Sequence, residues 1–128
     1  MKRLSVLTAG VLFLACIISG CAGSKKSSSQ TLKARLEIQG ICSNYTIKLL
    51  EGTLDKSLIE ANWTDETTGT AYTDVFGLAN PCNFPSTIKK GDEFYFVIDT
   101  GKQKDCAVCM AYYPTPQKKL SIKVLPNP

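Results

Sequence analysis

The folded part of the chain opens with an alternating stretch, Leu32-Lys33-Ala34-Arg35-Leu36-Glu37-Ile38-Gln39. Apolar and polar side chains alternate along it with a period of two residues, which is typical of a β-strand with one buried face. Gly40 then interrupts the pattern. Residues 32–38 are therefore predicted to form a half-buried strand, which needs neighbouring strands to cover its edges.

The next stretch, residues 45–50, repeats the alternation. Tyr45, Ile47 and Leu49 are expected on the buried face, and Thr46 on the opposite face. This stretch is short, and it begins a few residues after the first alternating stretch, with Gly40 between the two. The spacing favours two strands that follow each other closely.

Further strand candidates follow after short polar or proline-rich stretches: a segment running towards Trp63, then residues 70–76, 93–98 and 120–124. Phe94 and Phe96 share one face of the most apolar candidate, which is therefore expected to be central. Helical periodicity is weak throughout. Several short strands at this spacing predict an all-β fold, either a sandwich or a small antiparallel barrel, whose closure would protect the strand edges.

The amino-terminal segment has the layout of an export signal. Two basic residues precede an uncharged apolar run that ends in Ile18-Ser19-Gly20-Cys21. These four residues resemble the lipobox of bacterial lipoproteins. The resemblance implies cleavage before Cys21 and acylation of its thiol and new amine, which would tether the chain to a membrane. An ordinary secretory signal with a chance cysteine is the alternative.

The predicted domain organisation follows from this signal. Residues 1–20 form the signal peptide, and residues 21–30 form a flexible tether rich in serine, because they lack apolar periodicity. Residues 31–128 form a single β-domain with one modest core. No repeat and no second domain boundary is visible.

The charge balance gives little support for nucleic-acid binding. The chain has 15 lysines and arginines against 11 acidic residues. Its basic runs, such as Lys89-Lys90 and Lys118-Lys119, are short and are not interleaved with aromatic residues. We expect them to be solvated surface, and we expect no nucleic-acid partner.

Four cysteines of the predicted domain, Cys42, Cys82, Cys106 and Cys109, are candidates for disulfides. An even count outside the cytoplasm favours disulfides, and four cysteines allow three pairings. The preferred pairing joins Cys82 to Cys106 and Cys42 to Cys109, because both bonds then close long loops. A tight ring between Cys106 and Cys109 is the main rival.

The spacing of Cys106 and Cys109 also raises two chemical alternatives. A thioredoxin-like redox centre needs its first cysteine at a helix amino terminus, and no amphipathic helix is predicted here. Four thiolates could hold zinc, but an oxidising compartment favours disulfides. The residue after Cys109 is Met110, so the haem attachment motif is absent. Disulfides that stabilise the fold are the favoured interpretation, with no cofactor and no metal.

No catalytic constellation is recognisable. The chain has no histidine, so the commonest general base is missing. No glycine-rich phosphate loop and no serine nucleophile motif occurs. Four aromatic residues, Trp63, Tyr72, Tyr112 and Tyr113, could form a ligand surface, although such residues more often pack in a core or along a sheet edge.

Beyond the lipobox, residues 40–124 resemble small uncharacterised exported proteins of Bacteroidota-type bacteria. The similar motifs are Ile41-Cys42, Ile59-Glu60-Ala61-Asn62-Trp63, Cys82-Asn83-Phe84-Pro85, Lys90-Gly91-Asp92-Glu93-Phe94 and Cys106-x-x-Cys109-Met110-Ala111. The resemblance brings no activity and no site residues. It implies a compact β-barrel of the OB type, a fold that hosts many functions.

Two functional hypotheses follow. The first is a non-enzymatic lipoprotein of the cell envelope, whose disulfide-linked domain binds another envelope protein or a glycan. The second is a thiol–disulfide or metal-handling envelope protein that works through Cys106 and Cys109. Ala22 and Gly23 follow Cys21, in place of the acidic residue that retains enterobacterial lipoproteins in the inner membrane, so an outer-membrane location is preferred.

Overall fold

The computed structural model describes residues 30–127, so the predicted signal peptide, Cys21 and most of the predicted tether lie outside the described residues. The described part contains two short 3₁₀ helices, η1 (Ile41–Ser43) and η2 (Pro81–Asn83). Its strands are β1 (Leu32–Gln39), β2 (Tyr45–Glu51), β3 (Glu60–Thr64), β4 (Ala71–Leu78), β5 (Glu93–Ile98), β6 (Lys119–Leu120) and β7 (Ile122–Val124). No helix within residues 30–127 has the length and apolar character needed to cross a membrane.

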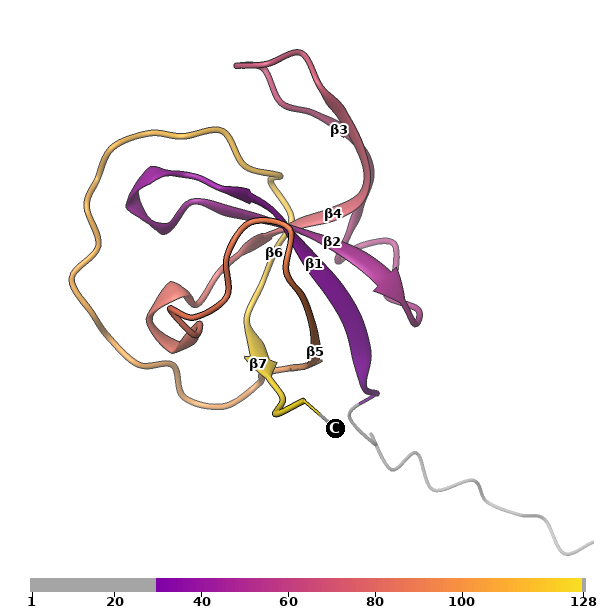
Figure 1. Ribbon diagram of the computed structural model, residues 1–128, viewed down its shortest axis with the longest axis vertical. Coiled ribbons are helices and arrows are strands. Elements are labelled where there is room, and N and C mark those ends of the chain that lie inside the picture. The colour runs from indigo at the N-terminus through magenta and orange to yellow at the C-terminus, as the bar shows by residue number, and fades with distance from the viewer. Residues whose placement is uncertain (1–29, 128) are drawn as a thin grey trace, which may run out of the picture.

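All seven strands belong to one sheet with the order β3-β4-β2-β1-β5-β7, and β6 pairs with β4. Every neighbouring pair is antiparallel except the two-residue parallel pairing of β4 with β6. The sheet is not closed. The last strands of the chain nevertheless pair near both ends of the strand order, because β6 pairs with β4 and β7 pairs with β5. The predicted all-β class is therefore confirmed, and Figure 1 shows the strands crossing tightly around one centre.

One hydrophobic core lies inside this curled sheet. The alternation in β1 is confirmed, since Leu32, Ala34, Leu36 and Ile38 are each at most 7 % exposed. The core also takes side chains from the other strands and from the segment before β3: Ile47, Ile59, Phe76, Leu78, Phe94, Phe96, Leu120 and Ile122. Residues 93–98 form β5, which has β1 and β7 as neighbours and is the last strand but one in the order, so the predicted strand is internal but is not at the centre of the sheet.

Irregular positions in two strands help the sheet to curl. The pairing of β1 with β2 shifts register twice, once after Lys33 and once between Leu36 and Ile38. Such bulges increase the local twist and bend of a strand. In β4, Asp74 has a left-handed backbone with φ of 54°. It lies where β4 passes from its β3 partner to its β2 partner, and the β3–β4 hairpin projects from the rest of the sheet (Figure 1).

A buried amide joins β7 to the end of β4. Asn80 is 5 % exposed and follows β4 directly. Its side-chain nitrogen donates to the Ile122 carbonyl over 2.8 Å, and its side-chain oxygen accepts from the Ile122 N–H over 2.9 Å. The Asn80 amide therefore takes the place of a neighbouring strand at Ile122, where the backbone would otherwise be buried without partners.

The expectation for Thr46 is wrong. It was predicted on the solvent-facing side of β2, but it is 0 % exposed. Thr46 pairs with Gly77, and a Cβ atom on Gly77 would lie 3.1 Å from the Pro116 carbonyl oxygen. The chain after residue 113 thus passes over this face of the sheet. A local alternation cannot reveal this second covering layer, because it comes from residues far along the chain.

Candidate binding surface

The connection between β5 and β6 is the largest irregular feature of the described chain. We call residues 101–117 the strap. It contains no strand and no helix, and it sweeps in a wide arc past η1 before returning to the centre of the sheet (Figure 1). Without a hydrogen-bonded ladder, the strap needs other restraints to hold one position.

Two disulfides supply these restraints. Cys109 of the strap is bonded to Cys42 in η1, and Cys106 is bonded to Cys82 in η2. The preferred pairing is therefore confirmed, and the tight ring between Cys106 and Cys109 is not formed. The two bonds link residues 67 and 24 positions apart, so they connect the strap to two loops that are distant in sequence.

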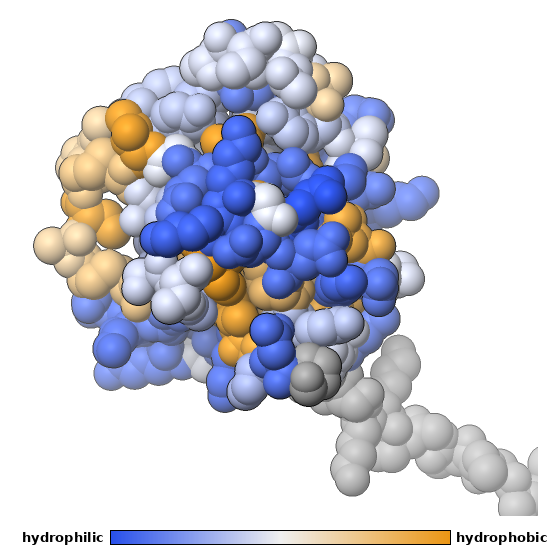
Figure 2. All heavy atoms as spheres, viewed as in Figure 1, coloured by the Kyte–Doolittle hydropathy of each residue, from blue (hydrophilic) through white to orange (hydrophobic). Residues whose placement is uncertain are grey.

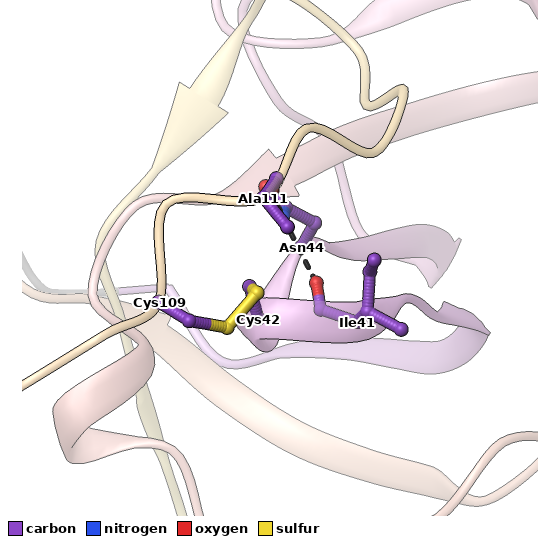
Figure 3. The surroundings of a disulfide bond; sticks show 5 residues. All are labelled: Ile41, Cys42, Asn44, Cys109 and Ala111. Atoms are coloured by element: carbon purple, nitrogen blue, oxygen red, sulfur yellow. Dashed lines mark hydrogen bonds between the residues drawn. A yellow bond between two sulfur atoms is a disulfide. The ribbon is translucent and has the colours of Figure 1, made fainter.

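The turn that receives Cys109 is itself unusual. Cys42 and Ser43 have left-handed backbones, with φ of 55° and 58°. Such values are uncommon for residues other than glycine. The Asn44 side chain reinforces the turn by donating to the carbonyls of Ile41 at 2.9 Å and Ala111 at 3.3 Å. Figure 3 shows Asn44 between the turn and the strap, beside the disulfide.

Several residues of the strap contact the domain. Cys109 bonds to Cys42, and the Tyr113 ring packs on Gly40, where a Cβ atom would lie only 2.7 Å from its Cδ1. Glycine is therefore required at position 40 by close approach. Pro114 and Pro116 are then buried. Val108, Met110 and Tyr112 of the strap, by contrast, are exposed.

Exposed residues beside the Cys42–Cys109 disulfide form an apolar surface. Large apolar side chains are exposed at four places in the described chain: Ile41 at 59 %, Val108 at 46 %, Met110 at 94 % and Tyr112 at 78 %. We call these four residues the apolar patch. All of them lie next to, or within three positions of, Cys42 or Cys109. Figure 2 shows orange and tan atoms gathered along one side of the molecule, where Figure 1 places the strap.

A cleft of about 1010 Å³ lies between the strap and β3, and Val108, Met110 and Tyr112 of the patch are among the residues that line it. It is lined by Trp63, Tyr112 and Tyr113, together with Glu60 and Glu66. The Tyr112 hydroxyl donates to Glu66 over 2.7 Å and bridges the strap to the turn after β3.

The predicted aromatic surface therefore forms in part. Trp63, Tyr112 and Tyr113 share the cleft, whereas Tyr72 contacts the Trp63 ring from β4, with centroids 5.9 Å apart.

The electrostatics around the cleft come from carboxylates beside tyrosines. The hydrogen bond to Glu66 raises the pKa of Tyr112. Burial, with the negative charge of Asp65 nearby, raises the pKa of Tyr72. Both tyrosines thus remain neutral hydrogen-bonding groups at physiological pH rather than nucleophiles or bases.

The turn after β3 is organised by Asp65, which is 1 % exposed. Burial alone would raise its pKa, but hydrogen bonds from Thr67 and Thr68 outweigh this effect and lower the pKa. The Thr67 amide and hydroxyl donate to Asp65 over 2.9 and 2.7 Å. The Asp65 carboxylate is occupied by hydrogen bonds within the turn, and Asp65 is not among the residues that line the cleft.

The groups available at this surface follow from its cysteines, its acidic residues and its exposed side chains. Cys42, Cys82, Cys106 and Cys109 are all oxidised, so none offers a thiolate. Among residues 30–127, no group of three metal-ligating side chains comes together. What the surface does offer is exposed apolar area and neutral hydrogen-bonding groups.

Sequence reasoning named Ile41 only in a motif that carries the resemblance to other exported proteins, did not single out Val108, and considered Met110 only as part of the cysteine motif. The available signal was the spacing of Val108, Met110 and Tyr112 around Cys109. That spacing predicts a shared side in an extended chain, but it does not show whether the shared side faces the core or the solvent.

The fold and surface define a class, a disulfide-linked all-β domain with an exposed apolar strap. Comparison of the chain with protein-family models, with curated protein sequences and with solved structures finds no match in any of the three. Any functional assignment therefore depends on the residues of this chain.

Proposed function

We propose that this protein is a membrane-anchored bacterial lipoprotein whose β-domain is a non-enzymatic binding module of the cell envelope. The observation that carries the proposal is the gathering of all four exposed large apolar side chains of the described chain around one disulfide. Contiguous exposed apolar surface on a soluble domain typically marks an interaction site. Scattered single residues would carry no such argument.

The position of the patch supports binding at a distance from the membrane. The tether would join the domain at Leu32, whereas Ile41 follows the opposite end of β1. β1 has 8 residues, so its ends are separated by up to roughly 26 Å at about 3.3 Å per residue. The patch therefore faces away from the anchoring point, where it can meet another envelope component.

Oxidised cysteines support the same location. Two disulfides fit an oxidising compartment outside the cytoplasm. The lipobox residues supply the anchor, Cys21 is the proposed acylation site, and the outer membrane is the proposed destination because Ala22 and Gly23 follow the cysteine.

The anchor is tested by mass spectrometry of non-reduced protein purified from membranes, with peptide mapping. We expect an amino-terminal peptide that begins at acylated Cys21, and Cys21→Ser should release the protein from the membrane fraction. An unmodified amino terminus at another residue would contradict the lipoprotein proposal.

The binding role is tested by placing a photo-crosslinking amino acid at position 110 of the full-length protein in cells. Its matched control is the same amino acid at Thr53, an exposed position beside the start of β1. We expect discrete crosslinked products from position 110 only. Equal crosslinking at both positions, or none at position 110, would contradict a binding role for the patch.

A further inference from the structure

We infer that the strap binds an extended polypeptide segment by strand addition, so that the partner is a protein of the envelope rather than a glycan. This inference rests on the proposed function and names the chemistry of its partner. The argument comes from the backbone of the strap, from the side chains of the patch and from the charges next to them.

The strap has an available backbone edge. Between residues 102 and 117, no N–H donates to another backbone group of the described chain. In an extended chain the N–H and C=O of one residue point to the same side, and those of its neighbours point to the other side. The Ala111 carbonyl accepts from Asn44 and so faces the domain. The backbone N–H groups of Met110 and Tyr112 donate to no other backbone group of residues 30–127, so they are available to a partner.

This edge is held in place before any partner arrives. Cys106 and Cys109 are covalently bonded to two separate loops, and the Tyr112 hydroxyl is bonded to Glu66. A segment that is already restrained loses less conformational entropy when it binds. Strand addition to a fixed edge uses main-chain hydrogen bonds for affinity and alternate side chains for specificity.

The side chains of the patch select for a polypeptide. Ile41, Val108 and Met110 are aliphatic or thioether groups that cannot hydrogen-bond well to sugar hydroxyls. The fourth member, Tyr112, already donates its hydroxyl proton to Glu66. Apolar residues at alternate positions of an added strand would instead cover these side chains, as cross-strand neighbours do within a sheet.

The charges beside the patch and the composition of the chain's own tether limit which partner can bind. Lys102 and Lys104 are exposed and take part in none of the ion pairs found among residues 30–127. They would favour acidic residues at one end of the added strand. The chain's own residues 21–29 are polar and join the domain near Leu32. They offer no apolar alternation to cover the patch, so we assign it to a different protein.

The test is selection of short random peptides displayed on phage, against the mature full-length protein in detergent. We expect enrichment of sequences with apolar residues at alternate positions and acidic residues near one end. Synthetic versions of the enriched peptides should slow hydrogen exchange at the backbone amides of Val108, Met110 and Tyr112. N-methylation of alternate peptide residues should abolish binding in one register only.

Two matched variants give the contrast. Met110→Lys should weaken peptide binding by about tenfold or more, because Met110 lies at the centre of the patch. Thr53→Lys makes a comparable change at an exposed position away from the patch and should leave binding unchanged. Because Met110 is 94 % exposed, Met110→Lys should fold normally, which the melting temperature checks.

Three outcomes would overturn the inference. Peptides that bind without slowing amide exchange would show docking by side chains alone. Binding of purified peptidoglycan fragments, with no enriched peptide, would assign the surface to a glycan. In both cases the protein remains a binding module. If neither probe binds and position 110 crosslinks to nothing in cells, both the strand-addition inference and the proposed binding function fail.

Discussion

β1 and the strap both carry apolar side chains, but the two segments are held in place in opposite ways. β1 has a hydrogen-bonded neighbour along each edge, and its apolar residues are buried. The strap has no neighbouring strand, its residues Val108, Met110 and Tyr112 are exposed, and two disulfides fix its position. A segment can thus be held in place by burial or by covalent restraint, and only the covalently restrained segment is left open to a partner.

The largest effect should come from removing the covalent restraint. Cys42→Ala with Cys109→Ala removes the disulfide between residues 67 positions apart. By the chain-entropy relation, this should lower the free energy of unfolding by about 4 kcal/mol. Removing Cys82 and Cys106 in the same way opens a link of 24 positions and should cost about 3 kcal/mol. Urea denaturation of both variants measures the difference. The reverse order would indicate that contacts of the strap, rather than loop length, dominate.

The same comparison can be made with single apolar side chains. Leu36→Ala in β1 should destabilise the domain by about 2–5 kcal/mol, because it leaves a cavity where the side chain was wholly buried. Met110→Ala in the strap should change stability by no more than about 0.5 kcal/mol, since that side chain lies in solvent. Thermal denaturation of the two variants is sufficient. A large loss from Met110→Ala would show that the patch packs against the domain.

Substitution of Asn80 tests how much one side chain contributes to stability at Ile122, where the Asn80 amide takes the place of a neighbouring strand. Asn80→Leu removes both hydrogen bonds to Ile122 and leaves its buried N–H and C=O without partners, at a cost of about 1–3 kcal/mol. Asn80→Asp keeps the acceptor and loses the donor, and serves as the closer control. If denaturant midpoints are unchanged in Asn80→Leu, the backbone at Ile122 has found other partners.

The smallest effect concerns the turn after β3 and depends on pH. The folded-state pKa of Asp65 lies below its ordinary value of 3.8. Its stabilising contribution is therefore complete above pH 3.8, declines as the pH falls towards the folded-state pKa, and is lost below it. Asp65→Asn should cost about 1 kcal/mol at neutral pH. Stability curves of the two proteins should converge in acid, and parallel curves would contradict this role.

Several elements of the fold were predictable because their causes are local. Residues 32–38 alternate strictly, and β1 buries the expected face. Residues 93–98 are the most apolar strand, and β5 has neighbours on both edges. The preferred disulfide pairing was predictable from loop length, although the rival ring between Cys106 and Cys109 could be dismissed only when Cys42 and Cys82 were seen beside their partners.

The binding surface was only partly predictable. The aromatic residues of the cleft were identified from the sequence, but Tyr72 proved to lie behind Trp63. The apolar patch was not predicted, because Val108 and Met110 resemble core residues in composition. Their exposure depends on the course of the strap, which the bond from Cys109 to Cys42 fixes against the domain.

The sequence by itself determined the strand pattern, the all-β class and the residues able to form disulfides, because alternation and residue type act over a few positions. The tertiary structure decided which face of each extended segment is covered. Thr46 is buried because Gly77 lets the distant chain at Pro116 approach the sheet, while Met110 is exposed because nothing in the described chain covers the outer side of the strap. Whether the second face of a strand is buried depends on segments remote in sequence, and the alternation of residues along the strand itself does not reveal them.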